Sequence, residues 1–132
     1  MATPQAPVIL VVDDTRETRA LIRRLLQRAG MQVIEADSGE AAIRSIESAR
    51  PDLVVLDLRL PGISGLDVAR WVRMHPDPLI AQTVLLACSA STQPEVISEA
   101  RDAGCDDFEG KPFDVPSFAP RIRDLLSRRS RS

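Results

Sequence analysis

The sequence is poor in the residues that mark several common classes of protein. Its two cysteines among 132 residues are too few for a disulfide framework, and its single histidine does not join them at the spacing of a metal site. No stretch approaches the roughly 20 apolar residues of a membrane span, and residues 1–7 lack the basic region and apolar core of a signal peptide. We therefore expect a cytoplasmic protein with reduced thiols.

Charged and aromatic residues narrow the choice further. The 17 basic residues nearly balance the 19 acidic ones, so the net charge of -2 gives no reason to expect nucleic acid or a charged membrane surface as a partner. Aromatic residues make up 3% of the chain, which leaves few side chains for stacking a cofactor ring. Lysine is rarer still, because Lys111 is the only one in the chain.

Apolar runs and helical patterns alternate along the chain. Three apolar runs indicate strands at residues 8–12, 53–57 and 83–88, a short and more polar run indicates an edge strand at 32–36, and a short strand is expected at 106–109. Helical spacing of apolar residues lies between and after them, at 15–30, 39–49, 66–74, 94–103 and in a last helix that ends at about 128. Strands that alternate with helices predict a parallel sheet with helices on both faces.

The length suits one domain. We expect a loose lead-in at residues 1–7, one domain at 8–128 and a basic tail at 129–132. Pro120 falls early in the last helical pattern, where it should break or delay the helix, so the regular part is expected to start only near this residue.

The residues that follow the strands carry the chemistry. Asp13 and Asp14 follow the first strand, Asp57 ends the third, Ser89 follows the fourth and Lys111 the fifth. Right-handed crossovers bring the carboxyl ends of parallel strands to one rim, where open α/β sheets bind their ligands. Taken singly, each of these residues also has a structural explanation, as a cap or a surface charge.

Together these residues suit phosphoryl transfer. Three converging carboxylates repel one another and need a counter-charge, which Mg²⁺ supplies when oxygen ligands hold it. Lys111 adds a compact positive charge suited to a phosphoryl oxygen, and Ser89 adds a hydroxyl donor. Carboxylate, metal, hydroxyl and ammonium are the parts that phosphoryl transfer to an aspartate needs.

Over almost its whole length the chain resembles the receiver domain of two-component response regulators. The resemblance implies a flavodoxin-like, doubly wound α/β fold, with five parallel strands in the order 2-1-3-4-5 and about five helices. Each matching piece is short, but the order and spacing of the pieces are specific. They are Val12-Asp13-Asp14, the strand ending in Asp57 with Pro61 and Gly65 after it, Ser89-Ala90, and Phe108 with Lys111-Pro112-Phe113.

The resemblance implies an acceptor and a metal site. Asp57 would take a phosphoryl group from a histidine kinase or a phosphotransfer protein. Asp14, Asp57 and the backbone carbonyl of Arg59 would bind Mg²⁺ directly, and Asp13 would act through water.

The resemblance also implies a phosphoryl-binding set and a switch. Ser89, the backbone amide of Ala90 and Lys111 would hold the phosphoryl oxygens. Phe108 would be the rotameric switch that turns inward when Ser89 moves. The bond between Lys111 and Pro112 would be cis, which an X-Pro bond tolerates at modest cost.

Two positions beside the acceptor bear on how long a phosphoryl group would last. Arg59 is a long cation that can shield the acyl phosphate, bind a phosphoryl oxygen or extend into solvent. Ser91 offers no acid to activate water. Together these residues favour a long-lived phosphoryl group.

The main expectation is a phosphoacceptor switch, not an enzyme beyond its own phosphorylation and dephosphorylation. We expect no output domain on this chain, a monomer or weak homodimer, and contact with an unknown downstream protein on the face around Phe108. One alternative is a receiver-like scaffold that is not phosphorylated, against which the intact set of rim residues argues. Another is a magnesium-dependent aspartyl-phosphate phosphatase, whose second acid would stand where this chain has Arg59. A flavin carrier would need a phosphate-cradling loop after Val12, which is absent.

Overall fold

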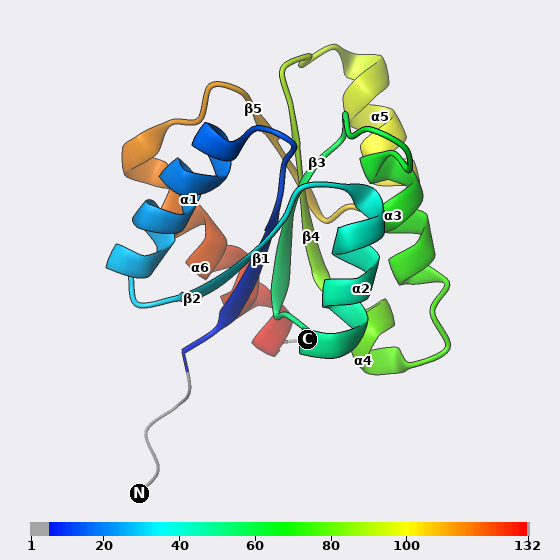
Figure 1. Ribbon diagram of the computed structural model, residues 1–132, viewed down its shortest axis with the longest axis horizontal. Coiled ribbons are helices and arrows are strands. Elements are labelled where there is room, and N and C mark those ends of the chain that lie inside the picture. The colour runs from blue at the N-terminus through cyan, green and yellow to red at the C-terminus, as the bar shows by residue number, and fades with distance from the viewer. Residues whose placement is uncertain (1–5, 132) are drawn as a thin grey trace, which may run out of the picture.

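Five strands form one sheet in the computed structural model, which describes residues 6–131 (Figure 1). Their order across the sheet is β2-β1-β3-β4-β5, and each neighbouring pair is parallel. This confirms the predicted fold class and strand order. The strands are β1 Val8–Val12, β2 Gln32–Ala36, β3 Leu53–Asp57, β4 Val84–Ser89 and β5 Asp107–Gly110.

Helices cover both faces of the sheet. Figure 1 shows α1 and α6 on one face and α2, α3 and α5 on the other. The described part of the chain holds α1 Arg16–Arg28, α2 Gly39–Ala49, α3 Gly65–Arg73, α4 Pro78–Ala81, α5 Pro94–Asp102 and α6 Val115–Arg131.

Each face of the sheet has its own apolar core. Successive residues of a strand point to opposite faces, so in β1 Leu10 packs in a cluster with Ile46 of α2, whereas Ile9 packs in a cluster with Phe118 of α6. All four side chains are fully buried. The central strands are therefore fixed from both sides, and the loops at their carboxyl ends start from rigid positions.

A short helix between α3 and β4 was not predicted. The sequence patterns assigned no element to residues 75–82, and Pro76 and Pro78 indicated only the end of the preceding helix. In the structure Pro78 occupies the first turn of α4, where a missing N–H costs nothing. The Asp77 side chain accepts a hydrogen bond from the amide of Leu79, and Ile80 is buried. One turn of helix therefore forms because it is capped and anchored in the core.

The expected start of the last helix was wrong. Helix α6 begins at Val115, and Pro120 lies inside it; the helix also continues to Arg131, past the expected end at residue 128. A proline in the second turn removes a single backbone hydrogen bond. Phe118 and Ile122, on either side of it, are fully buried against the sheet, and this packing outweighs the loss.

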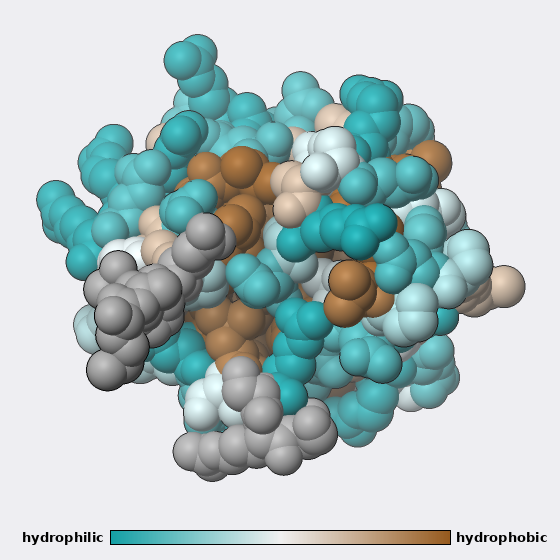
Figure 2. Space-filling model, turned by 90° about the horizontal axis from the view of Figure 1, so that it is seen from below, coloured by the Kyte–Doolittle hydropathy of each residue, from teal (hydrophilic) through white to brown (hydrophobic). Residues whose placement is uncertain are grey.

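Figure 2 views the molecule from below, at the end where the strands begin. Hydrophilic side chains dominate this view and surround a smaller apolar area. Between residues 6 and 131, no helix combines the length and apolar character needed to cross a membrane.

Candidate functional site

The site lies where the strand order reverses, at the adjoining carboxyl ends of β1 and β3. Strand β2 lies on one side of β1 and β3 on the other, and open α/β sheets bind ligands at such a point. Asp13 and Asp14 follow β1, and Asp57 ends β3. One carboxylate oxygen from each of the three lies within 4.8 Å of the other two. The structure thus brings together the three acids that the sequence assigned to one rim, which we call the carboxyl rim.

Asp57 is buried, with 6% of its surface exposed. Its Oδ1 accepts a hydrogen bond from the backbone amide of Arg59 at 3.0 Å. Burial raises the pKa of the Asp57 carboxyl above its ordinary value, against the lowering effects of the Arg59 amide and the Lys111 ammonium, and the charge of Asp13 adds to the rise. Gly65 lies so close that any side chain there would collide with the Asp57 carbonyl oxygen, so the start of α3 packs directly against the backbone of Asp57.

Asp13 is the most buried of the three acids, at 2% exposure, whereas Asp14 is exposed. The amide of Asp13 donates to the carbonyl of Ala36 in β2 at 3.1 Å. Its Oδ1 accepts a hydrogen bond from the amide of Thr15 at 2.8 Å. Asp13 is therefore held by its neighbours, while the carboxylate of Asp14 faces solvent at the mouth of the site.

Lys111 supplies positive charge to two of the acids. Its Nζ lies 2.7 Å from Oδ2 of Asp13 and 3.2 Å from Oδ2 of Asp57. Burial of the ammonium lowers its pKa, but the hydrogen bond to Asp13 and the charge of Asp57 outweigh this effect, so the pKa of Lys111 lies above its ordinary value. The bond to Pro112 is cis, and the Lys111 amide donates to the carbonyl of Ser89 at 2.9 Å. The β5–α6 loop is thereby joined to the end of β4.

Ser89 and Phe108, the predicted switch residues, lie on neighbouring strands. Ser89 is 3% exposed, and its hydroxyl oxygen accepts a hydrogen bond from the amide of Ser91 at 3.1 Å. Ala90 is exposed and follows β4 directly. Phe108 is half-buried against the core on the α2, α3 and α5 side, and its carbonyl accepts from Arg121 at 2.6 Å. In the register of β4 and β5, Ser89 pairs with Gly110 and Phe108 pairs with Ala87, so the two predicted switch residues are not paired with each other.

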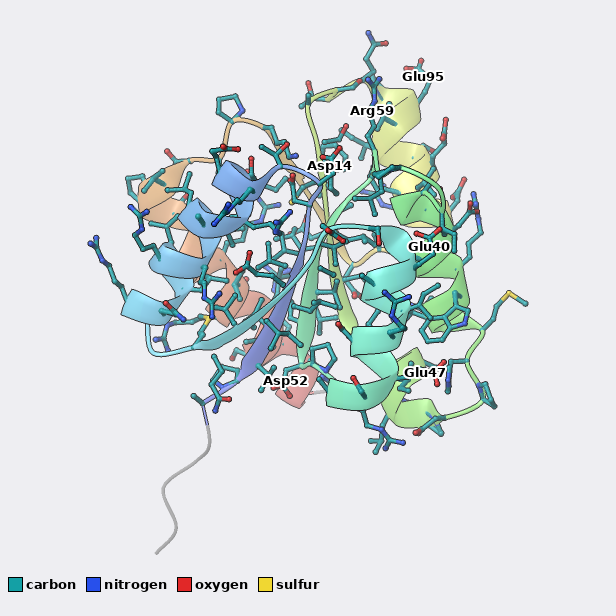
Figure 3. The ribbon with its side chains drawn as sticks, in the orientation of Figure 1. Asp14, Glu40, Glu47, Asp52, Arg59 and Glu95 are labelled. Carbon is teal, nitrogen blue, oxygen red and sulfur yellow. The ribbon has the colours of Figure 1, made fainter. Side chains whose placement is uncertain are left out.

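Arg59 sends its side chain away from the acids. The residue is exposed, and Figure 3 shows its side chain extending upward near the start of α5, beyond Asp14. Of the three orientations considered for this side chain, the structure has the one that extends into solvent.

Two contacts to Asp13 were not identified from the sequence. These are the amide of Thr15, already described, and the guanidinium of Arg19, which donates to the Asp13 carbonyl at 2.7 Å. Arg19 lies on the helical face that a periodicity argument assigns to solvent, so only the approach of α1 to the β1–α1 loop reveals its partner.

Comparison with known proteins finds related sequences and structures over most of the chain. The family model of the response regulator receiver domain matches residues 9–123. Response regulator MprA from Mycolicibacterium vanbaalenii is 40% identical over 120 residues. A crystal structure of a response regulator from Chloroflexus aurantiacus superposes with a TM-score of 0.87 at 31% identity, covering 93% of this chain and 99% of that one.

The matched proteins differ greatly in length. The alignment with MprA covers 91% of this chain but 50% of MprA. Virulence sensor protein BvgS from Bordetella pertussis is 37% identical over 134 residues, which are 96% of this chain but 11% of BvgS. The chain thus spans half or less of these two curated relatives.

Proposed function

The chain belongs to the response regulator receiver domain family, and we propose that it is a phosphorylation-dependent switch whose acceptor is Asp57. The observation that carries the proposal is the Lys111 ammonium, which contacts Asp13 and Asp57 at 2.7 and 3.2 Å. A single compact cation, shared by two buried acids, is suited to a phosphoryl oxygen that replaces one of its contacts.

The proposed reaction moves a phosphoryl group from a histidine to Asp57. A carboxylate oxygen attacks the phosphorus, the new P–O bond forms, and the P–N bond breaks with its electron pair going to the imidazole. Asp57 must be ionised to attack, and Lys111 and the Arg59 amide favour that form. The donor is a histidine kinase or a phosphotransfer protein.

The acids fit a magnesium ion. Three carboxylates with oxygens within 4.8 Å of one another form a hard oxygen donor set, and one ammonium does not balance their charge. Asp14, Asp57 and the backbone carbonyl of Arg59 would hold the ion, with Asp13 acting through water. Bound there, Mg²⁺ would supply positive charge for the phosphoryl oxygens.

The response would pass through Ser89. Its hydroxyl, the amide of Ala90 and Lys111 would hold the phosphoryl oxygens. The hydroxyl oxygen accepts a hydrogen bond from the Ser91 amide and its own hydrogen can still be donated, so movement of the hydroxyl toward a phosphoryl oxygen would draw the β4–α5 loop with it. Phe108 lies beside a cavity of about 30 Å³ between α5 and β5 and would turn further inward, changing the face offered to a downstream protein.

A phosphatase reading has little support in the site. Such an enzyme needs a second acid two residues after its nucleophile to protonate the leaving group. Here that residue is Arg59, an exposed base whose side chain extends away from the acids (Figure 3).

The test is phosphoryl uptake from acetyl phosphate, followed by intact-mass spectrometry. With Mg²⁺ the protein should gain one phosphoryl group that is labile to base, and with a chelator it should gain none. Asp57→Asn should abolish uptake, whereas Asp106→Asn, at the other end of the sheet, should leave it unchanged. Uptake that persists in Asp57→Asn, or an adduct on Ser89, would contradict the assignment, and no uptake in the parent would favour an unphosphorylated scaffold.

A further inference from the structure

Arg19 joins the loop that carries the acids to the edge strand β2. One terminal nitrogen of its guanidinium donates to the backbone carbonyl of Asp13 at 2.7 Å, and Nε donates to Oε1 of Glu35 at 3.0 Å. The Arg19 side chain is 15% exposed and the Glu35 side chain 25%. A planar guanidinium held by two acceptors has little freedom to turn, so the contact with Asp13 is fixed in direction.

The carbonyl that Arg19 contacts belongs to the peptide plane between Asp13 and Asp14. A peptide group is rigid, so fixing its carbonyl limits rotation about the backbone bonds on either side. Those two rotations set the directions in which the neighbouring side chains leave the chain. A single hydrogen bond therefore limits the directions in which both side chains leave the backbone toward the site.

We propose that Arg19 is a positioning residue for the metal site, and that Glu35 holds it in place. This inference rests on the proposed magnesium site. Within the described residues, Arg19 donates no hydrogen bond to a carboxylate of the site, and it acts through the Asp13–Asp14 peptide. Glu35 offsets the positive charge of Arg19, so the guanidinium can lie beside a cation site with less repulsion.

Arg23 provides a matched control on the same helix. It lies one turn after Arg19, and its terminal nitrogen contacts the other oxygen of Glu35 at 2.5 Å. Its side chain is 47% exposed. Within the described residues it pairs with Glu35 and makes no hydrogen bond to Asp13. Removing Arg23 takes away an ion pair between α1 and β2, whereas removing Arg19 takes away such a pair and the carbonyl contact.

The experiment compares magnesium binding by calorimetry in the parent, Arg19→Gln and Arg23→Gln, at a temperature where all three are folded by circular dichroism. Loss of a group that orients metal ligands typically costs 10–100-fold in affinity, so Arg19→Gln should raise the Mg²⁺ dissociation constant by about tenfold and Arg23→Gln by less than about twofold. Glu35→Gln should raise it as well, and should add nothing when combined with Arg19→Gln. Arg19→Lys, which can still donate to the carbonyl, should recover part of the affinity.

A second measurement does not need the metal. The Thr15 amide donates to the Asp13 carboxylate, so hydrogen exchange at Thr15 should be faster in Arg19→Gln than in the parent and unchanged in Arg23→Gln. Equal magnesium affinities in the two variants would overturn the inference. If the parent itself bound no Mg²⁺, the proposed metal site would fail, and unchanged exchange at Thr15 would then also reject Arg19 as the residue that orients Asp13.

Discussion

The two ends of the sheet treat their acidic residues in opposite ways. At the carboxyl rim, three carboxylates lie together and two of them contact one ammonium, that of Lys111. At the opposite end, which we call the amino rim, Asp52 and Asp106 are matched by separate donors. Oδ2 of Asp106 accepts from the amide of Leu85 and from Arg73, both at 2.8 Å, and Oδ2 of Asp52 accepts from the amide of Val8 at 2.8 Å. Figure 3 shows Asp14 and Asp52 at these opposite ends.

Arg73 connects several chain segments of the amino rim through hydrogen bonds. Its guanidinium donates to the carbonyls of Gly104, Ala81 and Thr83 at 2.9, 2.8 and 2.7 Å, and to Asp106. These contacts join the end of α3 to α4, to the start of β4 and to the turn before β5. The guanidinium thus satisfies backbone groups that three chain segments leave unpaired.

This difference distinguishes acids that stabilise the fold, such as Asp52 and Asp106, from a cluster of acids that could bind a metal ion. Buried polar groups are normally paired because leaving one unpaired is costly. Both rims follow that rule, because each carboxylate oxygen of Asp13 and Asp57 also has a donor, so the two rims differ in net charge and not in pairing. The carboxyl rim carries an excess of negative charge that only an added cation would balance, and this imbalance, more than the presence of aspartates, marks it as the site.

Removing Arg73 should have the largest effect on stability. Arg73→Met leaves three carbonyls without this donor and Asp106 with the Leu85 amide alone, and at about 1 kcal/mol net for each hydrogen bond the free energy of unfolding should fall by about 2–4 kcal/mol. Urea denaturation measures it. Arg70→Met on the same helix is the control, because its pair with Asp67 is largely exposed and should be worth less than about 0.5 kcal/mol. Equal losses in the two variants would remove the distinction between the rims.

Neutralising Asp57 should change stability in the other direction and by less. Burial and the charge of Asp13 raise the pKa of Asp57, so its ionised form costs folding free energy when no magnesium is present. Asp57→Asn should therefore unfold at higher urea concentration than the parent without Mg²⁺, with a gain below about 2 kcal/mol. With Mg²⁺ the parent should gain stability through ligand binding and the variant much less. A loss of stability in metal-free Asp57→Asn would show that the carboxyl rim is balanced after all.

The same comparison should depend on pH. A carboxyl whose pKa is higher in the folded chain holds its proton more tightly there, so its contribution favours folding at low pH and is lost as pH rises through the folded pKa. The advantage of Asp57→Asn over the parent should therefore grow as pH rises from the ordinary aspartate value of about 4, and then level off. Urea midpoints at a series of pH values without metal test this, and an advantage that stays constant would contradict the raised pKa.

Sequence patterns predicted the strands, which depend on local periodicity, and the site residues that follow the strand ends. The bounds of β1, β2 and β3 were all as predicted, because β1 and β3 are continuous apolar runs and the more polar β2 lies between Gly30, which ends one helix, and Ser38, which caps the next. Helix α4 and the start of α6 were missed, because prolines at Pro78 and Pro120 are local signals that burial of neighbouring side chains overrides.

Such patterns could not predict the contacts that the long arginine side chains make. Arg19 and Arg73 act through backbone carbonyls of segments 6 and 8–31 residues away. A helical pattern does not distinguish one arginine from another among the sixteen in the chain. The partners of Arg19 and Arg73 are visible only in the folded chain. Lys111 was found because it is the single lysine and follows the last strand.

The smallest expected effect concerns Lys111. It is measured as the rate at which an amine-selective reagent acetylates this side chain. Its side chain is 23% exposed and contacts Asp13 and Asp57, and its raised pKa leaves little of the reactive uncharged amine. We expect slow acetylation at Lys111 by peptide mapping, compared with the N-terminal amine of the same chain. Beryllofluoride, a phosphoryl mimic, should slow it further when added with Mg²⁺. Asp13→Asn neutralises the carboxylate that lies 2.7 Å from Nζ, which should lower the pKa of Lys111 and speed labelling. Fast labelling in the parent, unaffected by the mimic, would mean that the ammonium does not stay between the acids, and the carboxyl rim would then lack the cation on which the proposed acceptor site depends.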